Sequence, residues 1–121
     1  MIYIANAFSS QMLEMDDSLV RFQTVTPEAV RAALESGAPW QSAVGHADTA
    51  TVFTDEVGIV EIPHNRVNVT LLPGDVLFVG QIAGGRLPEG ATRLPVGFRL
   101  VWRRVEVYYP DYQPPCKETA A

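Results

Sequence analysis

The apolar stretch at residues 2–7, Ile-Tyr-Ile-Ala-Asn-Ala, is the first indication of how this chain folds. A short apolar run of this kind is typical of a buried strand. The strand is expected to end at a polar elbow over residues 6–10, where Asn6 and Ser9 offer an amide and a hydroxyl. Ligands often bind beyond the carboxyl ends of strands in α/β sheets, so the elbow is a candidate binding site. The alternative is that Asn6 and Ser9 only cap a turn.

Two helices are predicted further along the chain. Thr26-Pro27-Glu28 supplies an N-cap, a proline at the first helical position and an early acid, and this helix is expected to run to residue 36 and stop at Gly37. The second helix is expected to take Asp48 or Thr49 as its cap and to stop at Gly58.

Strand patterns and turn residues account for most of the remaining sequence. Strands are predicted at 2–7, 20–25, 65–72, 76–83 and 98–109. Pro73-Gly74-Asp75 is expected to form a turn, and the run rich in glycine and proline at 84–90 a loop. The sequence therefore predicts a single α/β domain, with a mixed sheet of about five strands flanked by helices.

The length of 121 residues is enough for one domain, which we place at 1–109, with a flexible tail at 110–121. The single cysteine, Cys116, lies in that tail and argues against a disulfide scaffold or a cysteine-based zinc site. No apolar run approaches the roughly 20 residues that span a bilayer, and the N-terminus lacks the basic region of a signal peptide. We expect a cytoplasmic protein without membrane contact.

The net charge of −5 argues against a protein that coats DNA or long RNA. Residues 1–61 carry a net charge of −7, whereas residues 62–121 carry +2. All but one of the nine basic residues are arginines, whose forked guanidinium suits phosphate recognition. Arginines of the second half can therefore line a small anionic pocket without making the whole surface basic.

Common nucleotide-binding, metalloprotease and serine-hydrolase motifs are absent, and two histidines 18 residues apart do not predict a metal site. Two other features could carry chemistry. His46 precedes the expected N-terminus of a helix, where backbone N–H groups favour a phosphate. Arg86 and Glu89 lie three residues apart in the loop and could serve phosphoryl chemistry. The alternatives are a loop imidazole satisfied by backbone and a solvated ion pair worth under about 1 kcal/mol.

Four segments in this order resemble one known family. They are 3–13 (YIANAFSSQML), 43–49 (AVGHADT), 65–69 (NRVNV) and 86–90 (RLPEG). Together they are similar to the viral type III anti-CRISPR ring nucleases, which have relatives in bacterial CRISPR loci. The resemblance covers about residues 2–109, and its NAFS-x-x-ML and GH motifs are fairly specific.

The resemblance implies a homodimer that binds cyclic tetra-adenylate in a cleft across its two-fold axis and cleaves it without metal or other cofactor. It implies His46, Arg86 and Glu89 as catalytic residues. The implied ligand contacts are Asn6, Ser9, Gln11, Thr49, Arg66 and Gln81. The product would be linear di-adenylate with a 2′,3′-cyclic phosphate, formed by attack of a ribose 2′-OH on its own 3′-phosphate.

Asp48 stands where this family commonly has serine, and a carboxylate beside phosphates is unfavourable unless it turns away to cap the helix. This substitution favours an alternative function, in which the protein is a sponge or sensor that binds a cyclic oligonucleotide and releases it intact. A small structural protein with a vestigial pocket is a third possibility. We expect Trp40 and Trp102 in the core or a dimer interface, and His64 in a turn.

Overall fold

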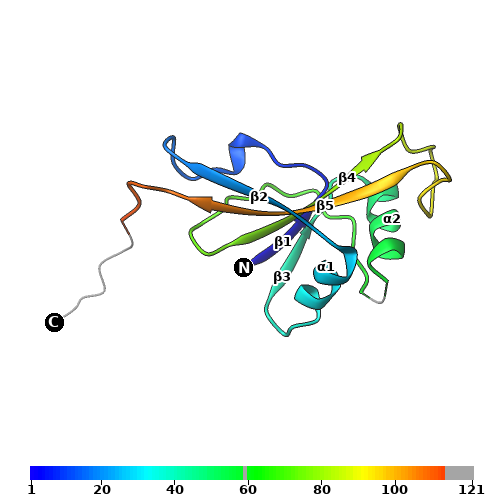
Figure 1. The fold of residues 1–121 in the computed structure, drawn as a ribbon, viewed down its shortest axis with the longest axis horizontal. Coiled ribbons are helices and arrows are strands. Elements are labelled where there is room, and N and C mark those ends of the chain that lie inside the picture. The colour runs from blue at the N-terminus through cyan, green and yellow to red at the C-terminus, as the bar shows by residue number, and fades with distance from the viewer. Residues whose placement is uncertain (59, 114–121) are drawn as a thin grey trace.

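The computed structural model describes residues 1–58 and 60–113. These residues form one domain with a five-stranded mixed sheet and two α-helices, which confirms the predicted fold class. In chain order the elements are β1 (Ile2–Ala5), the 3-10 helix η1 (Ser10–Met12), β2 (Leu19–Val25), α1 (Pro27–Leu34), β3 (Trp40–Ala43), α2 (Ala47–Val57), β4 (Val76–Ala83) and β5 (Arg99–Tyr108) (Figure 1).

The strands are arranged in the order β2-β5-β4-β1-β3. β1 pairs in parallel with both β3 and β4, so that Ile4 lies opposite Ser42 on one side and Phe78 on the other. β5 runs antiparallel to β4 and to β2. The three parallel strands β1, β3 and β4 therefore end at the same edge of the sheet, and the segments that follow them begin there.

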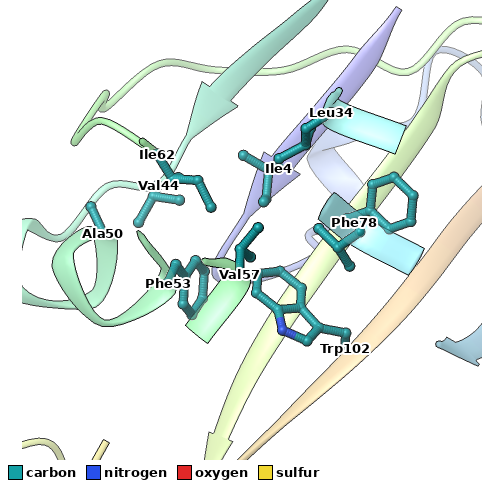
Figure 2. Packing of buried hydrophobic residues seen from close by; sticks show 10 residues of the cluster. Ile4, Leu34, Val44, Ala50, Phe53, Val57, Ile62, Phe78 and Trp102 are labelled. Carbon is teal, nitrogen blue, oxygen red and sulfur yellow. The ribbon is translucent and has the colours of Figure 1, made fainter. Parts of the chain in front are cut away.

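Both α-helices cover one face of the sheet, and the larger apolar core lies between them and the strands (Figures 1 and 2). Phe53 of α2 packs on Trp102 of β5, with ring centroids 4.7 Å apart. Ile4 and Phe78 come from β1 and β4, and Val30 from α1. Because alternate residues of a strand point to opposite faces, these strand residues all project toward the helices. Trp102 is thus a core residue, and Trp40 packs half-buried against the same cluster.

Local signals correctly place the start of α1 and the end of α2. Thr26 caps α1, and its side chain accepts a hydrogen bond from the Ala29 N–H at 3.1 Å. The helix ends at Leu34, two residues before the expected end, because the Ser36 hydroxyl donates to the Ala33 carbonyl and competes with the last helical turn. α2 stops at Gly58 as expected.

The opposite face of the sheet carries a smaller apolar cluster, where the prediction of a strand at 65–72 is wrong. Val69 and Leu71 of this segment are buried against Leu77 and Val105, whereas Val67 is exposed. The segment nevertheless forms no ladder with another strand: its β-bridges are isolated pairs, Leu13–Leu71 and, just before the segment, Val44–His64. The fifth strand is instead β3 (Trp40–Ala43), a short segment that the sequence analysis missed.

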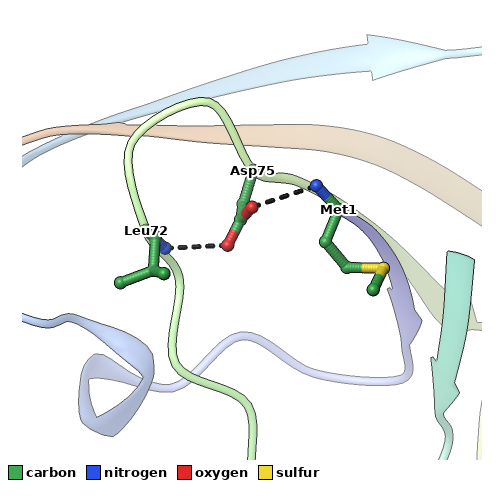
Figure 3. A network of polar contacts seen from close by, with 3 residues as sticks. All are labelled: Met1, Leu72 and Asp75. Atoms are coloured by element: carbon green, nitrogen blue, oxygen red, sulfur yellow. Dashed lines mark hydrogen bonds and ion pairs between the residues drawn. The ribbon is translucent and has the colours of Figure 1, made fainter. Parts of the chain in front are cut away.

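Hydrogen bonds of Asp75 and Tyr109 fix the turn before β4 and the end of β5. Asp75 accepts hydrogen bonds from the Met1 ammonium group at 3.1 Å and from the Leu72 N–H at 2.9 Å, which ties the start of β1 to the turn before β4 (Figure 3). The buried Tyr109 hydroxyl donates to the Leu71 carbonyl at 2.6 Å. The expected tail begins after Tyr109, and its residues 114–121, including Cys116, lie outside the described residues.

Candidate functional site at the carboxyl edge of the parallel strands

The segments that follow β1, β3 and β4 meet at one edge of the sheet. Asn6 directly follows β1, and its side-chain Oδ1 accepts a hydrogen bond from the Gly45 N–H at 3.3 Å. Gly45 precedes His46, which lies between β3 and α2. The loop that carries Arg86 begins directly after β4 and lies beside α2 (Figure 1). The carboxyl edge of parallel strands is where α/β folds commonly bind ligands.

One cavity brings the three candidate catalytic residues together. It has a volume of about 510 Å³ and is lined by His46, Asp48, Arg86, Leu87 and Glu89. The side chains of His46, Arg86 and Glu89 are exposed. In the described parts of the chain, none of these three makes a side-chain hydrogen bond or an ion pair with another residue. Their polar groups are therefore available to a ligand, and Arg86 and Glu89 do not form the ion pair considered above.

The start of α2 differs from the prediction. His46 is the N-cap residue, with extended backbone angles (φ −135°, ψ 125°), and its side chain makes no capping hydrogen bond. Neither Asp48 nor Thr49 is the cap, because the chain stays extended through His46 after β3 and turns helical only at Ala47. The first backbone N–H groups of α2 therefore have no side-chain acceptor, and they lie at the end of the helix that carries His46 and Asp48. Such groups bind phosphates well.

Asp48 lies in the first turn of α2 and contacts the loop after β4. Its Oδ2 accepts a hydrogen bond from the Gly90 N–H at 2.8 Å. The carboxylate therefore turns toward the loop, and the expectation that it caps the helix is wrong. A negative charge in the first turn also interacts favourably with the helix dipole.

A second cavity, of about 350 Å³, lies on the sheet face away from the helices. Its lining residues are Asn6, Ala7, Phe8, Phe22, Val79, Gln81 and Arg103. Phe8 and Phe22 pack edge to face with centroids 5.6 Å apart. Arg103 donates a hydrogen bond to Oε1 of Gln81 at 3.1 Å. The sequence analysis did not single out Arg103, since only the pairing of β4 with β5 brings it next to Gln81.

The other candidate ligand contacts are more dispersed. Ser9 and Gln11 line a separate cavity of about 260 Å³. Ser9 also caps η1 by accepting from the Gln11 N–H at 3.2 Å, so the capping interpretation holds for this residue. Arg66 lies beside Gly45, where a Cβ on the glycine would be 3.6 Å from Cγ of Arg66. Thr49 is half-buried in the first turn of α2 and, like Arg66, lines none of these three cavities.

A larger cavity, of about 570 Å³, lies elsewhere, between α2 and the segment that follows it. Asp55, Glu61 and His64 are among its lining residues, and no arginine or lysine of the described chain lines it. A surface with this charge disfavours phosphates, so the smaller cavity at His46 is the better candidate for an anionic ligand.

Within 1–58 and 60–113, no three His, Cys, Asp or Glu side chains lie close enough together to hold a metal ion. In the same ranges, no helix has both the length and the apolar character needed to cross a membrane.

Comparisons with known proteins identify the family to which the chain belongs. No curated protein matches its sequence. Among solved structures it is similar to B116 of Sulfolobus turreted icosahedral virus (STIV), with a TM-score of 0.71 and 21% identity, over 87% of this chain and 97% of that one. At this identity the likeness shows a shared fold. The sequence model of the STIV B116-like family matches residues 2–95, which is most of the described domain. The chain therefore belongs to the STIV B116-like family.

Proposed function

We propose that the protein is a metal-independent ring nuclease that binds cyclic tetra-adenylate and cleaves it to linear di-adenylate, which switches off type III CRISPR signalling. The observation that carries the proposal is the cavity shared by His46, Arg86 and Glu89 at the carboxyl edge of the sheet. The resemblance to viral anti-CRISPR ring nucleases implies these same three residues. Membership of a family that includes a viral protein is consistent with an anti-CRISPR role.

The cavity residues supply the groups that cleavage of a ribose phosphodiester needs. The 2′-OH of the substrate attacks its own 3′-phosphorus, the bond from phosphorus to the 5′-oxygen breaks, and His46 donates a proton to that leaving oxygen. General acid catalysis of this kind contributes typically 10²–10⁴-fold in rate. Arg86 stabilises the additional negative charge on the oxygens of the pentacoordinate phosphorane. Asp48 already accepts a hydrogen bond from Gly90, so Glu89 is the cavity carboxylate left to take up the 2′-OH proton.

The ligand also explains why a dimer belongs to the proposal. A cyclic tetranucleotide has four phosphates, whereas each chain has one His46 cavity of about 510 Å³. A ring with four-fold symmetry contains a two-fold axis, so a symmetric dimer can hold it with two equivalent sets of contacts. Asn6 and Gln81, which line the neighbouring cavity, are then suited to contact the ring beyond the scissile phosphate. The proposal keeps the cytoplasmic location expected from the sequence.

One observation favours the alternative function of a non-catalytic sponge. The Asp48 carboxylate lines the same cavity as the candidate catalytic residues. The phosphoryl oxygens carry more negative charge in the transition state than in the ground state, so a nearby carboxylate opposes cleavage more than it opposes binding. Binding without cleavage is therefore the outcome that the experiment must be able to detect.

The test is incubation of the purified protein with labelled cyclic tetra-adenylate in EDTA, followed by separation of products and of bound from free ring. We expect conversion to linear di-adenylate, slowed at least about a hundredfold in His46→Ala. His64→Ala is the matched control, because His64 is also exposed but lines the acidic cavity on α2, and we expect it to cleave like the wild type. An intact ring bound by all three proteins would establish the sponge, and an intact unbound ring would refute both functions.

A further inference from the structure

The loop that carries Arg86 and Glu89 is held to the rest of the protein at two places. At its base, Gly84 packs directly on the returning chain: a Cβ at Gly84 would lie 2.9 Å from the Gly97 carbonyl oxygen and 3.0 Å from Cα of Phe98. At its tip, the Gly90 N–H donates to Asp48. Among the described residues, this is the one hydrogen bond that joins the loop to α2. The cavity residues of the loop lie between these two attachments.

The geometry of the tip explains how the Gly90 N–H becomes available. The Ala91 N–H donates to the Pro88 carbonyl at 3.1 Å, which closes a four-residue turn with Glu89 and Gly90 at its centre. Gly90 has φ +80°, the conformation that favours glycine at the third position of such a turn. The turn uses the N–H of its last residue only, so the N–H of Gly90 points outward and needs another acceptor. Asp48, 42 residues earlier in the chain, provides it at 2.8 Å.

We propose that Asp48 is a positioning residue, which holds Glu89 and Arg86 over His46 through its hydrogen bond to Gly90. This inference rests on the proposed ring-nuclease function. Glu89 directly precedes the anchored glycine, so its placement depends most strongly on the bond. Displacement of a catalytic group by about 1 Å can cost about a hundredfold in rate. The carboxylate that opposes phosphate binding by its charge thus serves catalysis by its position.

Two substitutions separate the hydrogen bond from the charge. Asp48→Ala removes both the acceptor and the charge, whereas Asp48→Asn removes the charge and keeps an amide oxygen as acceptor. We expect Asp48→Ala to lower kcat at least about tenfold, with ring affinity equal to or tighter than that of the wild type. Asp48→Asn keeps the acceptor and loses the charge that opposes cleavage, so we expect its kcat to equal or exceed that of the wild type, with ring affinity again equal or tighter. Asp55→Ala is the matched control, an exposed carboxylate on the same helix outside the His46 cavity.

Single-turnover cleavage, ring binding and amide hydrogen exchange measured on the same proteins decide the matter. In Asp48→Ala we expect faster exchange over residues 84–97 and unchanged exchange in the strands. In the wild-type background, Asp48→Ala should slow cleavage at least about tenfold. In a Glu89→Gln background the same substitution should slow cleavage much less, since Asp48 acts through Glu89. Wild-type kcat and exchange in Asp48→Ala, or equal damage in Asp48→Asn, would overturn the inference. If the wild type fails to cleave the ring while exchange responds as expected, the proposed function fails and the anchoring of the loop stands.

Discussion

The helix-covered core and the carboxyl edge of the parallel strands are built on opposite principles. In the core, Phe53 and Trp102 are almost fully buried and touch each other (Figure 2). At the edge, His46 and Arg86 are exposed and make no side-chain hydrogen bond within the described chain. The core is stabilised by excluded water and close packing, whereas these edge side chains keep their polar groups exposed, as binding residues commonly do. Stability and function should therefore respond to different substitutions.

The largest effect on stability is expected from the core. Trp102→Ala removes the largest fully buried side chain and leaves a cavity beside Phe53, so the free energy of unfolding should fall by about 3–5 kcal/mol. Cleavage per folded molecule should stay at the wild-type value. Urea unfolding at low temperature measures the loss, and Trp102→Phe should lose less. A loss below about 1 kcal/mol would show that Trp102 does not support the core as described.

The reverse result is expected at the edge. Arg86→Ala should slow ring cleavage by about 10²–10³-fold if Arg86 is the cation that faces the phosphate, as proposed. The free energy of unfolding should change by no more than about 0.5 kcal/mol, since Arg86 is exposed and unpaired. Arg93→Ala is the control from the same loop, because Arg93 does not line the cavity. Equal cleavage by the two variants would remove Arg86 from the mechanism.

The smallest effect is a pH dependence at the start of β1, remote from the edge. Burial, and to a lesser degree the negative charge of Asp75, raises the pKa of Tyr3 above 10.0. Because the folded-state pKa exceeds the unfolded value, the stabilisation is complete below pH 10 and is lost as the pH rises through the folded pKa. Urea unfolding should therefore show a steeper loss of stability above pH 10 in the wild type than in Tyr3→Phe. Identical slopes would contradict the assignment.

Local sequence signals determined the elements that depend on neighbouring residues alone. The cap at Thr26, the stop at Gly58 and the strand at 76–83 were all predicted correctly, because a capping residue, a glycine stop and a short apolar run bounded by turn residues are local properties. The segment 65–72 shows where this reasoning fails. Its residues Val69 and Leu71 are buried, whereas Val67 is exposed. A sequence does not reveal whether a neighbouring strand offers a free edge. β3 was missed because its four residues include two polar side chains and show no strand pattern of their own. They form a strand through their pairing with β1.

At the edge, the sequence supplied the residue types, and only the tertiary structure decided which of them meet. His46, Arg86 and Glu89 were singled out from motifs, and the parallel arrangement of β3 and β4 brings them to one cavity. Arg103 joins Gln81 only through the pairing of β4 with β5. Asp48 was expected to cap its own helix and instead binds Gly90. Helix propensities and caps act over a few residues, so they can be predicted from the sequence. The hydrogen bonds from Gly90 to Asp48 and from Arg103 to Gln81 join residues 42 and 22 positions apart, and they exist only once the sheet has formed.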